Sequence, residues 1–151
     1  FISLFISLLV LVSGNMIYRK TNNPPSTNDK IHVTFNVQPS HNEFSTKKLR
    51  VPPQTSFFDI MKMAQEEDDA FRFTYNMYPG LGAYITSIGG DAEDISNGAR
   101  FLWLLYNCNQ DLGAAQYHDV NGCTLSDTGV SSTYPKDGEI WIFEHVYLNW
   151  V

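Results

Sequence analysis

The sequence lacks the motifs that carry enzymatic chemistry. It contains no nucleophile elbow, phosphate loop, dinucleotide-binding fingerprint or zinc-protease helix. The carboxylates show no pairing typical of general acid and base, and no serine has a base at a recognisable spacing. The 4 histidines are scattered along the chain, at His32, His41, His118 and His145. We therefore expect a binding module and not an enzyme.

Basic residues are also few. Lys and Arg together number 10 against 16 Asp and Glu, which gives a formal charge of -6. This balance disfavours nucleic acid or an anionic membrane surface as a partner. The acidic run at residues 66–69 lacks the spaced oxygen ligands and central glycine of a calcium loop, so we interpret it as solvated surface. No metal site is expected.

Long apolar runs are absent except at the start of the chain. The run from Phe1 to Val12 is shorter than the roughly 20 residues that span a membrane, and it favours a signal peptide over residues 1–14. A membrane anchor is the alternative if further apolar residues precede Phe1. Residues 15–30 are polar and predict a disordered linker, which leaves residues 31–151 as the folded domain. We expect a secreted, extracellular protein with no membrane association once the signal is cleaved.

Only 2 cysteines are present, too few for a zinc site without paired histidines nearby. In an oxidising compartment Cys108 and Cys123 are expected to form a disulfide. The alternative is two free buried thiols. A bridge closing a loop of about 16 residues contributes roughly 3 kcal/mol in the chain-entropy estimate.

What the sequence does contain is strand patterns and one helix pattern. Apolar residues alternate with polar ones from Ile31 to Val37, and a weaker strand follows over residues 44–51, which together predict an antiparallel hairpin. Ser56 is predicted to be a helix N-cap, and Asp59, three residues on, resembles its capping-box partner. The expected buried face of this helix consists of Phe57, Ile60, Met61 and Ala64. Further strands are predicted at residues 71–77, 82–88, 101–106 and 139–147. The fold class is α+β, with mostly antiparallel strands and one helix packed on the sheet, broadly like a β-grasp.

The stretch from Gly82 to Ile88 stands out among these strands. Its alternation predicts that Tyr84, Thr86 and Ile88 share one face. Glycines bracket the stretch, and a residue without a Cβ lets another backbone or a flat ligand approach closely. An aromatic strand and a Gly-Val-Ser-Ser segment at residues 129–132 follow it.

These pieces, in this order, resemble the C-terminal β-domain of the transcobalamin and intrinsic factor family. The resemblance rests on Phe-Arg-Phe at residues 71–73, Gly-Ala-Tyr-Ile-Thr-Ser-Ile at 82–88, Trp103, Gly-Val-Ser at 129–131 and Tyr-Pro-Lys-Asp-Gly-Glu at 134–139. It extends over about residues 31–150. It implies a transcobalamin-like domain that contributes one face of a cobalamin (vitamin B12) site.

The resemblance also implies which residues touch the ligand. They are Gly82, Tyr84, Ile85, Thr86, Ser87, Leu102, Trp103 and Leu125. A large amphipathic ligand needs flat apolar surface with fixed amide donors and acceptors, which strand edges and an exposed Trp supply.

Two features of the family are not matched in these 151 residues. The family's helical domain and the histidine that it offers to cobalt have no counterpart here, and the loop that carries the cysteines is enlarged. A separate helical cobalamin-binding domain or a receptor is therefore a possible partner. The alternative hypothesis is an extracellular interaction domain that uses the same fold for a protein or glycan partner.

Overall fold

The computed structural model describes residues 29–40, 43–96, 99–108 and 122–149. The expected signal peptide and nearly all of the expected linker lie outside the described residues. Within the described residues, no helix is long and apolar enough to cross a membrane.

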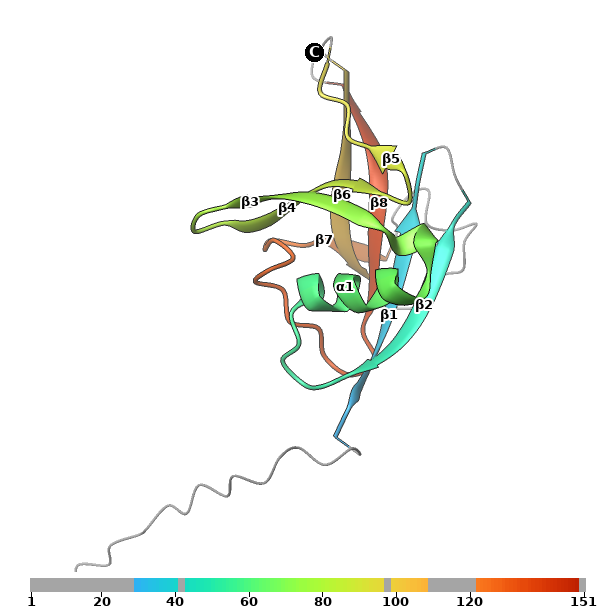
Figure 1. The fold of residues 1–151 in the computed structure, drawn as a ribbon, viewed down its shortest axis with the longest axis vertical. Helices are drawn as coiled ribbons and strands as arrows, with labels where there is room; N and C mark the ends of the chain where they lie inside the picture. Colours follow the sequence, from blue (N-terminus) through green and yellow to red (C-terminus); the bar gives the residue numbers. More distant parts are fainter. Residues whose placement is uncertain (1–28, 41–42, 97–98, 109–121, 150–151) are drawn as a thin grey trace, which may run out of the picture.

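A five-stranded sheet forms the back of the domain, with strand order β2-β1-β8-β6-β7 (Figure 1). The strands are β1 (Ile31–Gln38), β2 (Ser45–Val51), β6 (Ala99–Cys108), β7 (Cys123–Leu125) and β8 (Ile140–Asn149). Strands β1 and β2 form the predicted antiparallel hairpin, and among the described strands only the β1–β8 pairing is parallel. The prediction of a mostly antiparallel α+β domain is confirmed; the strand β7 was not predicted.

A second, three-stranded sheet was not predicted as a separate layer. It consists of β3 (Phe73–Tyr78), β4 (Gly82–Ile88) and β5 (Asp91–Ala92), all antiparallel. Figure 1 shows the β3–β4 hairpin crossing the larger sheet next to α1 and projecting beyond it. The turn of the hairpin, residues 79–81, is exposed.

The helix α1 (Phe57–Glu67) begins where the sequence predicts. The Ser56 hydroxyl accepts the backbone N–H of Asp59 at 3.1 Å and donates to its carboxylate at 2.7 Å. This satisfies one of the N–H groups that a helix start leaves without a partner. All four predicted face residues are fully buried, which confirms the helical face. A short 3-10 helix, η1 (Asp69–Phe71), leads into β3.

The main core lies between the larger sheet and the layer formed by α1 and the smaller sheet. Phe35 of β1 is at its centre, with ring centroids 5.1 Å from Phe57, 5.0 Å from Phe71 and 6.4 Å from Phe143. These rings come from four different elements, so truncating Phe35 opens a cavity that no single neighbour can fill. Such truncations cost about 3–5 kcal/mol.

One predicted strand face is wrong. Ile88 is fully buried whereas Tyr84 is 41% exposed, so the two side chains do not share a face. The register between β3 and β4 shifts so that Thr86 has no partner of its own on β3. An extra residue of this kind is a β-bulge, which reverses the alternation beyond it.

The disulfide between Cys108 and Cys123 is present and joins directly opposed residues of β6 and β7. It lies in a small apolar cluster with Ile142 and Phe44, separate from the main core. The pairing prediction is confirmed. Most of the long loop that the bridge closes lies outside the described residues.

Candidate ligand-binding face

An open pocket of about 220 Å³ lies where β4, β6 and the segment after β7 meet. Its lining is mainly apolar and includes Ile85, Trp103, Leu125, Val130 and Phe143. The residues come from separate parts of the sequence, and the crossing of the two sheets brings them together. Adjoining it is a second pocket of about 480 Å³ at the hairpin, which shares Tyr84, Ala83 and Gly129 with the first.

Four of the predicted ligand residues, Tyr84, Ile85, Trp103 and Leu125, line the first pocket. Gly82 lines the second, again with Tyr84. Because neighbours on one strand point to opposite faces, the presence of both Tyr84 and Ile85 means that the backbone of β4 also borders the site.

The other three predicted residues lie elsewhere. Thr86 and Ser87 sit at the bulge, and their hydroxyls each lie 2.7 Å from the hydroxyl of Thr74. Leu102 alternates with Trp103 along β6 and is paired with Val146, so it is on the opposite face of the strand. The structure therefore brings together only part of the predicted set.

Trp103 is not the exposed aromatic that we expected. It is 7% exposed, and its ring stacks on His145, its cross-strand partner, at 4.6 Å and an interplanar angle of 15°. The indole N–H donates to the carbonyl of Asp91 at 3.1 Å. Trp103 is thus a core residue whose edge forms the floor of the pocket. No sequence pattern indicates this, because β6 is apolar on both faces.

Tyr84 is the aromatic residue on the rim. Its hydroxyl donates to the carboxylate of Glu93, and its ring packs edge-on against Tyr78 at 6.3 Å. Burial, reinforced by the nearby Glu93 carboxylate, raises the pKa of Tyr84 to about 12. The phenol therefore stays neutral at physiological pH and its orientation is fixed by the carboxylate.

The segment from Asp91 to Glu93 thus supports both aromatic residues, Trp103 through a carbonyl and Tyr84 through a carboxylate. Sequence reasoning missed both supporting residues. Their partners are 12 and 9 residues away along the chain, and no local pattern signals such pairs.

The glycines around β4 predict that another part of the chain approaches this strand closely, and Ser131 does so at Gly82. Gly82 has a φ of 84°, and the Ser131 hydroxyl accepts the N–H of the next residue, Ala83, at 2.9 Å. This interaction anchors the start of β4 to the segment that follows β7, and so closes one side of the site.

A third pocket, of about 420 Å³, continues the groove past Leu125 and is more polar. Its lining includes Asn107, Ser126, Asp127, Tyr134 and Glu139. We call the three adjoining pockets the ligand groove. It has an apolar end at the hairpin and a polar end rich in hydroxyl, amide and carboxylate groups.

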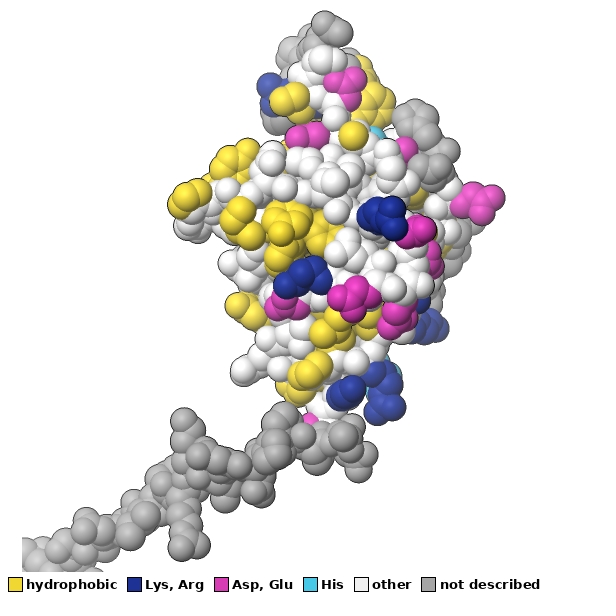
Figure 2. All heavy atoms as spheres, in the orientation of Figure 1, with side chains coloured by type: hydrophobic (Ala, Val, Ile, Leu, Met, Phe, Trp, Pro, Cys, Tyr) yellow, Lys and Arg dark blue, Asp and Glu magenta, His cyan; other side chains and the backbone are white. Residues whose placement is uncertain are grey.

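Large apolar side chains are exposed over the hairpin, as the yellow surface in Figure 2 shows. They are Tyr75, Met77, Tyr78, Leu81 and Tyr84. An exposed apolar patch on a projecting hairpin is typical of a surface that contacts another molecule. Among the described residues there is no group of three or more His, Cys, Asp or Glu side chains that could hold a metal ion.

Comparisons with known proteins identify the fold. No protein-family model matches the chain, and no curated protein does. A crystal structure of haptocorrin in complex with Cbi is similar, with a TM-score of 0.57 and 22% identity over 77% of this chain. The match covers 25% of the haptocorrin chain, so this chain corresponds to about a quarter of that protein.

A second solved structure shows the same fold as a whole chain. It is a Ruminococcus gnavus ATCC 29149 protein named as a "putative metal binding protein", with a TM-score of 0.56 and 12% identity. The match covers 80% of this chain and 99% of that one. The fold therefore occurs both as part of the longer haptocorrin chain and as nearly the whole of a second solved chain.

Proposed function

We propose that this domain contributes one face of a cobalamin site, as a secreted, transcobalamin-like module. One observation carries the proposal. Four residues that the family resemblance marks for the ligand, from three separate strands, line a single open pocket. The likeness of the fold to part of haptocorrin supports it.

The shape of the groove agrees with a large flat ligand. An apolar floor of Ile85 and Trp103, bordered by strand backbone, offers both van der Waals surface and amide groups. The groove is open, so it covers only one side of a corrin ring. We infer that a separate helical domain or a receptor supplies the other side, because a site that covers half of its ligand binds it much more weakly than an enclosing one.

The role is binding and not catalysis in this proposal. The groove offers fixed apolar and amide surface, and the disulfide fits the oxidising compartment that secretion implies. In this proposal the β1–β2 hairpin, α1 and the central strand β8, connected broadly as in a β-grasp, form a rigid support for the β3–β4 hairpin.

An absorbance titration of the purified domain with cobalamin tests the proposal. Binding in the groove changes the solvent around the corrin and shifts its visible spectrum in a saturable way. The titration is repeated in the presence of a helical cobalamin-binding domain. The absence of any saturable change at millimolar ligand in both experiments would falsify the proposal.

A second candidate function is an extracellular interaction domain for a protein partner. The exposed apolar side chains of the β3–β4 hairpin favour it, because Tyr75 and Met77 line none of the three pockets of the groove. Met77, on β3, is 58% exposed. Replacement of Met77 by Asp would abolish such an interaction and leave the groove unchanged.

A further inference from the structure

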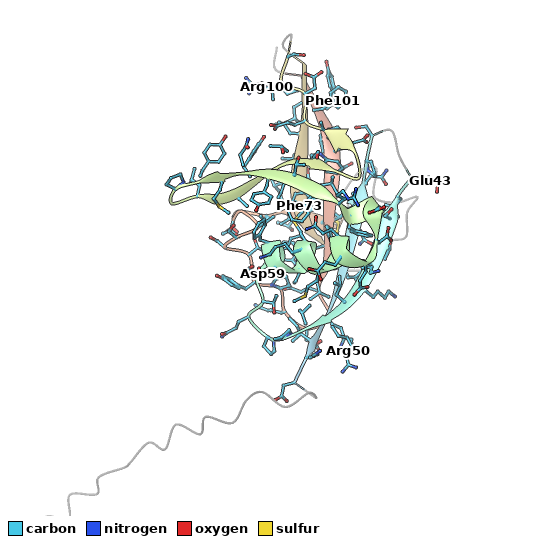
Figure 3. All side chains as sticks on the ribbon, in the orientation of Figure 1. Glu43, Arg50, Asp59, Phe73, Arg100 and Phe101 are labelled. Carbon is cyan, nitrogen blue, oxygen red and sulfur yellow. A yellow bond between two sulfur atoms is a disulfide. The ribbon has the colours of Figure 1, made fainter. Side chains whose placement is uncertain are left out.

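Three of the four edge strands in the described structure are protected against pairing with another chain. The edges are β2 and β7 in the larger sheet and β3 and β5 in the smaller one. Proteins protect an edge by keeping its strand very short or by placing charged side chains on it, Lys above all. Strands β5 and β7 have only 2 and 3 residues. Strand β2 carries Lys47, Lys48 and Arg50, and Figure 3 shows Arg50 at the lower end of the domain, away from the hairpin.

Strand β3 has neither protection. It is 6 residues long and contains no charged residue and no proline. The whole stretch from residue 73 to residue 90, which includes both strands of the hairpin, contains no Asp, Glu, Lys, Arg or His. Every residue of β3 after Phe73 is exposed. The edge is therefore both accessible and uncharged.

The outer backbone groups of β3 are available for a further strand. Among the described residues β3 pairs only with β4. No backbone hydrogen bond outside that pairing involves residues 73–77 in the described part of the chain. An edge strand presents a row of outward N–H and C=O groups, which an added strand can satisfy.

The side chains along this edge also favour an added strand. The ring of Tyr75 packs edge-on against Phe58 of α1, with centroids 4.9 Å apart, but remains partly exposed. Met77, two residues on, points to the same face of the strand and is more exposed. Neither residue lines the ligand groove. A strand added here would cover apolar side chains and leave the groove open.

Charge indicates which strand fits. A charged strand would find no opposite charge anywhere in the hairpin, so the partner strand must itself be uncharged. The β3 strand of a second copy meets this requirement. Each copy has a formal charge of -6, but all of its charged residues lie outside residues 73–90, so the contact brings no like charges face to face.

The sequence of β3 also matches itself in the antiparallel direction. When the pairing is centred on Asn76, Tyr75 of each copy lies opposite Met77 of the other, and Thr74 lies opposite Tyr78. Directly opposed residues of paired strands contact each other, and methionine sulfur makes favourable contacts with aromatic rings. Such a contact uses the same surface on both copies, as twofold symmetry requires.

We propose that β3 is a dimerisation edge, through which two copies of this chain pair antiparallel and join their three-stranded sheets into one continuous sheet. The contact lies outside the ligand groove. The inference therefore stands or fails independently of the proposed function.

Sedimentation velocity over a concentration series, up to about 0.1 mM, tests the inference. We expect the wild-type protein to form a dimer whose fraction rises with concentration and which added salt does not weaken, because the contact is uncharged. A protein that stays monomeric throughout overturns the inference. A dimer that dissociates as salt is added also overturns it, because ionic contacts at another surface would then hold the copies together.

Two matched variants locate the contact. Met77→Lys places a charge on the β3 edge and should weaken dimerisation at least about tenfold. Met63→Lys makes the same change at an exposed methionine of α1 and should leave dimerisation unchanged. Thermal melts check that both variants fold. Equal dimerisation of the two variants would show that the contact is not at β3.

Hydrogen exchange locates the contact without any substitution. At concentrations where the dimer forms, amides of residues 74–78 should exchange more slowly than in the dilute protein, whereas those of the protected edge β2 should be unchanged. Slower exchange at β2 with no change at β3 would contradict the inference.

Discussion

The side chain of Ser131 occupies the space that a Cβ atom on Gly82 would need. Such an atom would lie 2.5 Å from the Ser131 Cβ and 2.6 Å from its hydroxyl oxygen. The two residues are far apart in the sequence, and their contact joins the hairpin to the segment after β7. The ligand groove exists because these two parts of the chain meet there.

This contact makes Gly82→Ala a sharp test of the fold. The substitution adds a clash to the cost of a positive φ, which is about 1–2 kcal/mol for an ordinary residue. We expect a loss in the free energy of unfolding larger than that, measured by urea denaturation. Gly80→Ala is the matched control, because Gly80 has a φ of 79° and open space around its Cβ position. Equal losses in the two variants would show that the Ser131 contact contributes nothing.

Substitutions of Trp103 should destabilise the protein as substitutions of a core residue do, because its side chain is buried. Trp103→Ala removes a stacked and hydrogen-bonded ring. We expect the free energy of unfolding to fall by about 3–5 kcal/mol, as for Phe35→Ala. Trp103→Phe keeps an aromatic ring and loses the bond to the Asp91 carbonyl, so it should lose less. Thermal melts of the three variants check the order. A Trp103→Ala protein as stable as wild type would mean that the ring is not packed as described.

The comparison of Phe57 with Trp103 shows how far the sequence could predict the structure. Phe57 lies in an amphipathic helix, whose spacing separates the buried face from the exposed one. Trp103 lies in a strand that is apolar on both sides, where alternation carries no information. The face of Ile88 was predicted wrongly because a bulge at Thr86 depends on the partner strand. Support of the site by Glu93 is a tertiary interaction with no sequence pattern.

The phenol of Tyr84 gives a prediction for alkaline pH. Its pKa is raised from the ordinary 10.0 to about 12, so the neutral form is favoured in the folded state. The stability that it contributes is present below about pH 10 and is lost as the pH rises through about 12. A difference titration at 295 nm between wild type and Tyr84→Phe isolates this one phenol.

Glu93→Gln separates the two causes of the shift. Removing the carboxylate charge should lower the pKa of Tyr84, but the pKa should stay above 10.0 because burial is the larger cause. An unchanged titration would show that Glu93 does not hold the phenol. Gln keeps a side-chain oxygen that can accept the hydrogen bond, so the fold should be preserved.

The disulfide should stabilise the domain, but the fold should form without it. Cys108 and Cys123 lie outside the main core, so a double replacement by Ser should leave the sheet and α1 intact. We expect the free energy of unfolding, measured by urea denaturation, to fall by roughly 3 kcal/mol. Without the bridge the unfolded chain is less constrained and gains conformational entropy. Intact-mass analysis of the wild-type protein should find no free thiol; two free thiols would contradict the pairing.

The most direct test of a corrin-binding face compares two exposed apolar residues. Leu125 lines the groove and is 52% exposed, whereas Ile95 is 66% exposed and lines none of its three pockets. Replacement of each by Glu adds the same charge at the surface, with little expected effect on stability. We predict that Leu125→Glu weakens cobalamin binding at least about tenfold, or about 1.4 kcal/mol, and that Ile95→Glu leaves it unchanged in the same absorbance titration. Equal affinities for wild type, Leu125→Glu and Ile95→Glu would contradict the placement of cobalamin in this groove.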